Sequence, residues 1–314
     1  MSEKILSIEP IPPLEFFGVN ENKLKVISKY FPKVKLIARG HEVRALGDDD
    51  SVAQLEHRFK QFQSHYNKYG NLPLKEIERL LLSESVDGPE VDDSVLVYGQ
   101  NGILVRARTP NQKKIVKAVE KSDMVFVIGP AGSGKTYTAV ALAVRALKRR
   151  EVKRIILTRP AVEAGESIGF LPGDMKEKLD PYLQPLYDAL MDMLPPTKLA
   201  EHLEKGVIQI APLGFMRGRT LDHAFVILDE AQNATEPQMR MFLTRMGNSA
   251  KFIITGDVTQ VDLPKKFSSG LQKAWNLLSG TRGISFIELA GSDIVRHPLV
   301  SRIVDIYAKA DKNE

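Results

Sequence analysis

One stretch of the chain constrains its fold more than any other. It reads Gly129-Pro130-Ala131-Gly132-Ser133-Gly134-Lys135-Thr136 and fits the phosphate-cradling pattern G-x-x-x-x-G-K-[ST] at every required position. The apolar run before it, residues 124–128, is typical of a buried parallel strand, and the Ala-rich run after it, residues 137–147, is typical of a helix. An ordinary glycine-rich turn needs neither flank, so we interpret the stretch as a nucleotide-binding loop.

The same pattern predicts how the loop holds its ligand. Its glycines let backbone N–H groups turn toward phosphate oxygens, and the N-terminus of the following helix adds a partial positive charge. We expect Lys135 to reach the β- and γ-phosphate oxygens and the Thr136 hydroxyl to hold Mg²⁺.

Length and composition limit the kinds of protein in which this loop can occur. With 314 residues, of which 43% are hydrophobic and 26% charged, the chain has room for a large domain and a small one. No apolar run approaches the ~20 residues of a membrane span, and residues 1–5 lack the apolar stretch of a signal peptide, so we expect a cytoplasmic protein. The absence of cysteine excludes disulfides and thiolate metal sites. A net charge of +5 permits a nucleic-acid partner but does not by itself indicate one.

Residues 1–82 are predicted to form a small α+β domain. We expect these elements: a strand at 14–19, a helix capped by Asn20, strands at 34–38 and 42–46, and helices from about 51 to 66 and from 73 to 82. This β-α-β-β-α order resembles KH-like RNA-binding modules, but the G-x-x-G loop that clamps nucleic acid is missing. RNA binding and a docking or assembly role both remain open for this domain.

Residues 83–93 hold five acids, no bases and a Gly-Pro pair, which is typical of an interdomain linker. Residues 94–314 are predicted to form the second domain, which opens with a hairpin around Gln100-Asn101-Gly102. Beyond the loop, strand-like and helical runs alternate, as in a parallel sheet covered on both faces. The strand-like runs are 154–158, 207–210, 224–228, 251–255 and 284–289.

Two carboxylates, Asp229 and Glu230, directly follow the strand predicted at 224–228. They lie at the carboxyl end of a strand, where such sheets bind ligands. Behind a phosphate loop, we interpret them as a Walker B pair. Asp229 then holds Mg²⁺, usually through water, and Glu230 orients and deprotonates the water that attacks the γ-phosphate.

Two further patterns resemble motifs of superfamily 1 helicases, namely Asp229-Glu230-Ala231-Gln232 and Gly256-Asp257-Val258-Thr259-Gln260. The resemblance implies that Gln260 senses the γ-phosphate. It also implies that Gln112, in a Thr-Pro-Asn-Gln context, reads adenine. A side-chain amide suits this role because it can both donate hydrogen bonds to the adenine edge and accept them from it. Without the resemblance, Gln112 would be an exposed helix residue. Too few residues follow position 255 for the second RecA-like domain of those helicases, so any unwinding would require an oligomer.

Several blocks together resemble the PhoH-like ATPases, bacterial proteins induced by phosphate starvation. These are Thr158-Arg159-Pro160, Gly165-Glu166-Ser167-Ile168-Gly169-Phe170-Leu171-Pro172-Gly173-Asp174, Pro181-Tyr182-Leu183-Gln184-Pro185-Leu186-Tyr187-Asp188, Phe215-Met216-Arg217-Gly218-Arg219-Thr220 and Asp293-Ile294-Val295-Arg296-His297. The resemblance covers essentially the whole chain and matches the longer type with a small N-terminal domain. It implies a cytosolic ATPase with a RecA-like P-loop NTPase core, a ring oligomer, a role in RNA metabolism and an endoribonuclease partner.

Two functions stay open on these residues. In the first, the protein hydrolyses ATP with Mg²⁺ and uses the energy to move or remodel RNA. In the second, hydrolysis is slow and ATP orders an assembly or a surface for a protein partner. A small-molecule kinase fits less well, because Glu230 and Gln260 are suited to handling water.

A single RecA-like domain also lacks a neighbour that could supply an arginine to the γ-phosphate. If the site lies between subunits, Arg296 is the first candidate to act in trans, with Arg217 and Arg219 in reserve. The alternative for Arg296 is a helix cap or an ion pair with Asp293.

Should the core bind RNA, the first candidates for residues that contact it are Arg159, Arg217 and Arg219.

Overall fold

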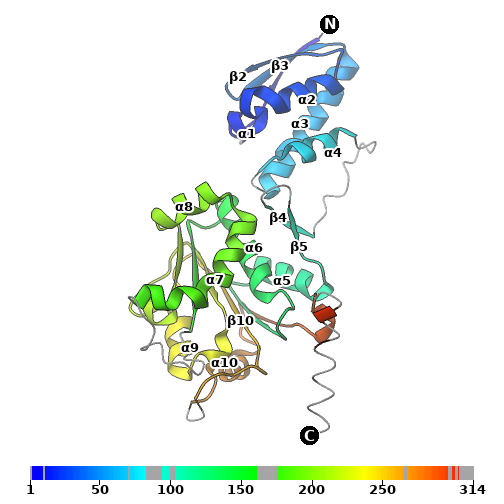
Figure 1. The fold of residues 1–314 in the computed structure, drawn as a ribbon. Coiled ribbons are helices and arrows are strands. Elements are labelled where there is room, and N and C mark those ends of the chain that lie inside the picture. The colour runs from blue at the N-terminus through cyan, green and yellow to red at the C-terminus, as the bar shows by residue number, and fades with distance from the viewer. Residues whose placement is uncertain are drawn as a thin grey trace. The chain divides into compact units, whose positions relative to one another are not determined.

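A computed structural model of the chain describes residues 2–9, 11–69, 71–82, 94–99, 103–160, 175–264, 267–295, 299–300 and 303. The chain divides into two compact units (Figure 1), one of Met1–Arg106 with Val144–Glu151 and one of Ala107–Ala143 with Val152–Glu314. The hairpin of β4 (Val95–Tyr98) and β5 (Leu104–Arg106) therefore lies in the first unit, whereas the sequence placed it in the second. The predicted linker, residues 83–93, lies outside the described residues.

The first unit contains a three-stranded antiparallel sheet with β3 in the middle, in the order β1-β3-β2. Its strands are β1 (Ser2–Ser7), β2 (Lys35–Arg39) and β3 (Glu42–Gly47), and its helices are α1 (Pro13–Phe17), α2 (Asn22–Tyr30), α3 (Asp49–Tyr69) and α4 (Leu74–Leu82). Phe16, Phe59 and Phe62 are buried together in the core of this unit. The predicted α+β character is confirmed.

Two local predictions for this unit are wrong. Residues 14–19 do not form a strand, because α1 occupies most of them and buries Phe16 and Phe17 together. Pro13 is the first residue of this helix, a position that the fixed φ of proline favours. The apolar run that follows led to the wrong prediction of a strand. Asn20 is not the helix cap either, since it lies at φ 53° in a short 3₁₀ turn, and Glu21 precedes the first residue of α2.

The second unit is built on a six-stranded parallel sheet in the order β11-β6-β10-β9-β7-β8. The strands are β6 (Met124–Ile128), β7 (Arg154–Arg159), β8 (Ile208–Pro212), β9 (Ala224–Leu228), β10 (Lys251–Gly256) and β11 (Ile284–Glu288). The predicted α/β class with a parallel sheet is confirmed. Strand β6 carries the phosphate loop, β9 carries Asp229 and Glu230, and β10 lies between them.

Helices flank the strands of this sheet (Figure 1). They are α5 (Pro110–Lys121), α6 (Lys135–Lys148), α7 (Met175–Met193), α8 (Pro196–Glu204), α9 (Glu236–Leu243) and α10 (Gly270–Leu278). The chain crosses from β6 to β8 through α6, α7 and α8 and returns through α9 and α10. Because parallel crossovers are right-handed, the two sets of helices lie on opposite faces of the sheet. On the α9 and α10 face, Phe126, Phe252 and Leu271 belong to one buried core.

No helix within the described ranges combines the length and the apolar character that crossing a bilayer requires.

Candidate functional site

The predicted phosphate loop lies between β6 and α6, at the carboxyl edge of the sheet. Two of its glycines are required by their surroundings. At Gly129 an added Cβ would lie 2.6 Å from Leu289 Cβ. At Gly134 φ is +78°, and an added Cβ would lie 2.8 Å from Gln112 Nε2. The loop therefore depends on glycine for its close approach to α5 and to the residue that follows β11.

Lys135 is the first residue of α6, and its side chain reaches back to the start of this loop. Its Nζ donates to Gly129 O at 2.7 Å and to Pro130 O at 2.9 Å. Burial lowers the pKa of Lys135, and the carboxylates of Asp257, Glu230 and Asp229 partly offset that effect. The ammonium group is thus held among carboxylates, close to where phosphate oxygens would enter.

Asp229 is buried, with 1% exposed, and both of its carboxylate oxygens are satisfied. Oδ1 accepts from Thr136 Oγ1 at 2.6 Å and from Thr255 Oγ1 at 2.5 Å. Oδ2 accepts from Arg159 Nε at 2.8 Å. The structure therefore brings together the two residues predicted to hold Mg²⁺, although Thr136 lies at the start of α6 and Asp229 follows β9, far apart in the sequence.

Arg159 is a site residue that the sequence did not assign to this carboxylate. It ends β7, next to β9, and its Nη1 also donates to Tyr182 O in α7 at 2.9 Å. Nη2 lies 3.9 Å from Glu230 Oε1. The guanidinium is thus held inside the unit and is less free to bind RNA than the sequence suggested. Its place at the end of a strand, beside a strand ending in two acids, was the signal for this role.

Glu230 has a backbone φ of 52°, in the left-handed region that residues with a Cβ rarely adopt. Backbone strain of this kind gathers at functional sites. Its side chain is 44% exposed, so it is accessible to solvent, and its Oε2 accepts from Gln232 Nε2 at 2.7 Å.

Asp257 connects the end of β10 to the phosphate loop. Its Oδ2 accepts from the Ala131 amide at 3.0 Å, and its own amide donates to Gln232 Oε1 at 2.9 Å. Glu230, Gln232, Asp257 and the loop thus form one hydrogen-bonded series. Gln260, three residues further on, is exposed, and its amide donates to Asp257 O at 3.1 Å.

Gln112 is buried rather than an exposed helix residue, with 5% exposed. Its Oε1 accepts from the Arg108 amide at 2.7 Å, and its Nε2 donates to Ser133 O at 3.0 Å. The side chain also completes a capping box with Thr109 at the start of α5. Gln112 therefore ties α5 to the phosphate loop, while adenine recognition by this residue remains a prediction.

A turn after β11 also contacts the loop. The Val295 amide donates to Gly132 O at 3.2 Å. Asp293 is buried and accepts from Asn111 Nδ2 at 2.7 Å and from the Ala290 amide at 2.8 Å. Burial would raise the pKa of Asp293, but hydrogen bonds from Asn111, Thr109 and Ala290 together hold it below its usual value. Arg296 lies outside the described residues, as does the block 165–174.

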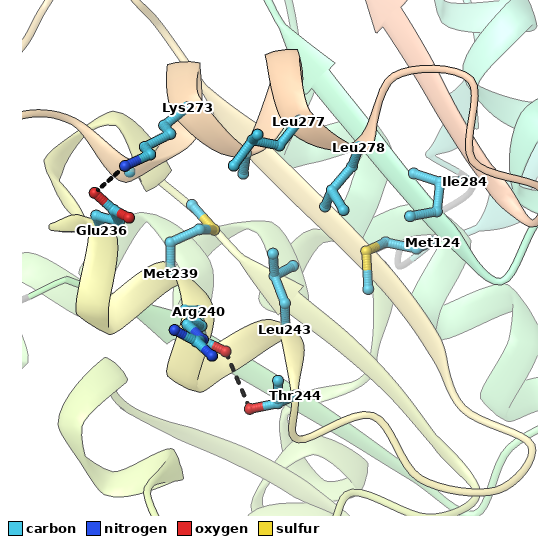
Figure 2. Close-up of a pocket in the computed structure, with 12 residues that line it drawn as sticks. Met124, Glu236, Met239, Arg240, Leu243, Thr244, Lys273, Leu277, Leu278 and Ile284 are labelled. Carbon is cyan, nitrogen blue, oxygen red and sulfur yellow. Dashed lines mark hydrogen bonds and ion pairs between the residues drawn. The ribbon is translucent and has the colours of Figure 1, made fainter.

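A separate cavity of about 470 Å³ lies between α9 and α10 (Figure 2). Its wall is mostly apolar, with Met239, Leu243 and Leu277 facing one another, although Glu236, Arg240, Thr244 and Lys273 also line it. The cavity reaches Met124 and Ile284, the first residues of β6 and β11. Those residues mark the amino edge of the parallel sheet, opposite the phosphate loop. The cavity is therefore distinct from the candidate nucleotide site.

The parallel sheet, the phosphate loop and the carboxylate pair at its carboxyl edge define a P-loop NTPase. The comparisons with known proteins are more specific. The family described as "PhoH-like protein" matches residues 104–308. The "PhoH-like protein" of Bacillus subtilis strain 168 is 46% identical over 318 aligned positions, covering 98% of this chain and 99% of the relative. The chain belongs to the PhoH-like family, as its sequence blocks predicted.

Two further comparisons extend this result. "Protein PhoH" of Escherichia coli K12 is 43% identical over 206 aligned positions, which cover 65% of this chain and 58% of that protein. Among solved structures, a Pif1 helicase from Candida albicans aligns with 63% of this chain and 42% of its own, at 15% identity and a TM-score of 0.35. At that score we draw nothing from the helicase.

Proposed function

We propose that this protein is a Mg²⁺-dependent ATPase that acts on RNA or ribonucleoprotein. The observation that carries the proposal is the hydrogen bond of 2.6 Å between Thr136 Oγ1 and Asp229 Oδ1. It brings the phosphate loop to the carboxylate of β9 across the intervening strand β10. A hydroxyl and a carboxylate at this separation can serve one cation together.

The donor set fits Mg²⁺. Both atoms are oxygens, which Mg²⁺ prefers, and it commonly takes one or two protein ligands and completes its shell with phosphates and water. No group of three or more His, Asp or Glu side chains that could form a self-contained metal cage occurs among the described residues. Bound Mg²⁺ would offset the charge that develops on the β- and γ-phosphate oxygens.

The chain's own residues supply the remaining tasks. Lys135 exchanges the carbonyls of Gly129 and Pro130 for phosphate oxygens, a charge-assisted contact that its present position prepares. Glu230, exposed and aligned by Gln232, orients the attacking water and accepts its proton. Gln260 is proposed to sense the γ-phosphate.

Loss of the ammonium group tests the ATPase proposal. In the full-length protein, Lys135→Ala should abolish steady-state ATP hydrolysis, while the melting temperature stays near that of wild type because the fold does not depend on this side chain. Lys121→Ala, which removes an exposed lysine from α5, is the matched control and should retain full activity. Full activity in Lys135→Ala would refute the nucleotide assignment.

Action on RNA, a cytoplasmic location, a ring assembly and an endoribonuclease partner are proposed from the family blocks in the sequence. Multiple-turnover ATPase rates with and without single-stranded RNA test the first of these. Stimulation supports a motor or remodelling enzyme, whereas a slow rate unchanged by RNA supports the alternative, a switch that ATP assembles. Weak, salt-sensitive RNA binding is also expected of the N-terminal unit, because scattered lysines would make its contacts.

A further inference from the structure

An exposed aromatic ring lies near the candidate nucleotide site, on the turn η4 (Leu213–Met216) that follows β8. The ring is that of Phe215, which is 61% exposed. Leu213 and Met216, on either side of it, are buried in the core. Two buried side chains therefore fix this turn in the core, while the ring between them stays in solvent. Burial of the ring thus contributes little to the free energy of folding.

A cation accompanies the ring. Arg217 is exposed, and its guanidinium forms no hydrogen bond or ion pair with another residue in the part of the chain that the structure describes. Arg219, by contrast, is partly buried, and its Nη2 donates to Gln209 Oε1 at 2.6 Å. Arg159 is committed to Asp229. Of the three arginines that the sequence offered for RNA, Arg217 is thus the available one.

The turn lies at the same edge of the sheet as the carboxylates. Pro212, the last residue of β8, pairs with Arg159 at the end of β7, and Thr158 pairs with Leu228, the residue before Asp229. Neighbouring strands lie about 4.8 Å apart, so η4 begins roughly 10 Å from Asp229. A strand of nucleic acid that contacts this turn would therefore pass close to the site of hydrolysis.

We propose that Phe215 and Arg217 form a contact for single-stranded RNA, in which the ring stacks on a base and the guanidinium binds a backbone phosphate. Proteins that hold single strands without reading sequence combine aromatic rings that stack on bases with cations that bind the backbone phosphates. The backbone nearby is open, because a Cβ at Gly214 or Gly218 would meet nothing within 4 Å. This inference rests on the proposed function, in which RNA is the partner.

The test measures the affinity of the full-length protein for a fluorescently labelled oligouridylate by anisotropy at several salt concentrations. Phe215→Ala should weaken binding about 5- to 150-fold, the effect of losing one base stack. Phe215→Trp should bind about as tightly as wild type, because it keeps an aromatic ring at this position. Arg217→Ala should weaken binding and lower the slope of log affinity against log salt concentration by about 1, because one phosphate contact is lost.

Matched controls separate this contact from general surface effects. Leu277→Ala removes another exposed apolar side chain, which is 71% exposed on α10, and Arg282→Ala removes another exposed arginine. Both should bind the oligouridylate as wild type does. Phe215→Ala should keep its melting temperature and its RNA-independent ATPase rate, which shows that the fold and the hydrolytic site are intact.

The outcomes also separate this inference from the proposed function. If wild type binds the oligouridylate and Phe215→Ala binds it equally well, the contact is wrong while action on RNA stands. If wild type hydrolyses ATP but binds no single-stranded RNA, the contact is wrong and the ATPase assignment survives. Unchanged RNA binding in Phe215→Ala with loss of a co-purifying protein would identify the turn as a protein-binding surface and overturn the proposal.

Discussion

Gln232 holds Glu230 in place, since its Nε2 donates to Glu230 Oε2 at 2.7 Å. The other end of the same amide accepts from the Asp257 backbone, and Asp257 in turn accepts from Ala131 in the phosphate loop. The carboxylate proposed to act on water is therefore connected to the loop through buried groups.

We predict that Glu230→Gln keeps ATP binding but slows hydrolysis by about a hundredfold or more, the scale of a positioned general base. The amide preserves the size of the side chain and removes its ability to accept a proton. Binding of a fluorescent ATP analogue and single-turnover hydrolysis check the two halves of this prediction. Glu236→Gln, at an exposed carboxylate on α9 paired with Lys273, is the control and should change neither quantity. An equal loss of ATP binding in Glu230→Gln would reassign Glu230 to a structural or metal-binding role.

Gln112→Ala should erode any preference for ATP over GTP if its amide reads the base. Because Nε2 also donates to Ser133 O, we further expect weaker binding of both nucleotides. Competition of ATP and GTP for the loop of wild type and variant measures both effects. Lys113→Ala, at the next and exposed position of α5, serves as the control. Base recognition by Gln112 is wrong if the wild-type protein binds the two nucleotides equally.

Arg296→Ala should reduce turnover about a thousandfold or more if this arginine completes the site of a neighbouring subunit. The residue before it donates its amide to Gly132 of the same chain, so the mixing experiment must separate action in cis from action in trans. Oligomers of Arg296→Ala mixed with Lys135→Ala should regain part of the ATPase activity, because some interfaces pair an intact arginine with an intact loop. Mixtures of Lys135→Ala with the Lys135→Ala/Glu230→Gln double variant should stay inactive. Verified mixed oligomers that recover nothing would count against action in trans.

Tyr137 should ionise later than an ordinary tyrosine. Burial, together with Asp192, whose Oδ2 accepts from the phenol at 3.1 Å, raises its pKa from 10.0 to about 12. Because the phenol stays protonated to a higher pH in the folded protein than in the unfolded chain, it contributes to the free energy of unfolding. That contribution is complete below pH 10 and is lost as the pH rises through about 12. The difference in phenolate absorbance between wild type and Tyr137→Phe should show this late titration. At neutral pH the variant should lose at most about 1 kcal/mol, the value of one partly exposed hydrogen bond. A phenol that titrates near pH 10 would show that Tyr137 is neither buried nor bonded to Asp192 in solution.

Local patterns in the sequence were sufficient for the elements whose conformation depends on near neighbours. The strands at 124–128 and 224–228 have the predicted bounds, since a continuous apolar run between polar ends is a signal of a buried strand. The same logic fails for β1 in the first unit. Ser2–Ser7 is mostly polar and half-exposed at Ile5, and it forms a strand because β3 supplies its hydrogen-bond partners. A strand stabilised by a distant partner leaves little trace in its own residues.

The sequence by itself predicted the phosphate loop, the carboxylate pair and the family, because each of these rests on short contiguous patterns. The order of the strands, and with it every contact between loops, was decided by the tertiary structure. Arg159 reaches Asp229 because β7 pairs with β9, and Gln112 reaches Ser133 because α5 packs beside the loop. The physical reason is that a hydrogen bond between distant segments depends on which elements become neighbours, and that follows from burying the apolar faces of the whole sheet at once.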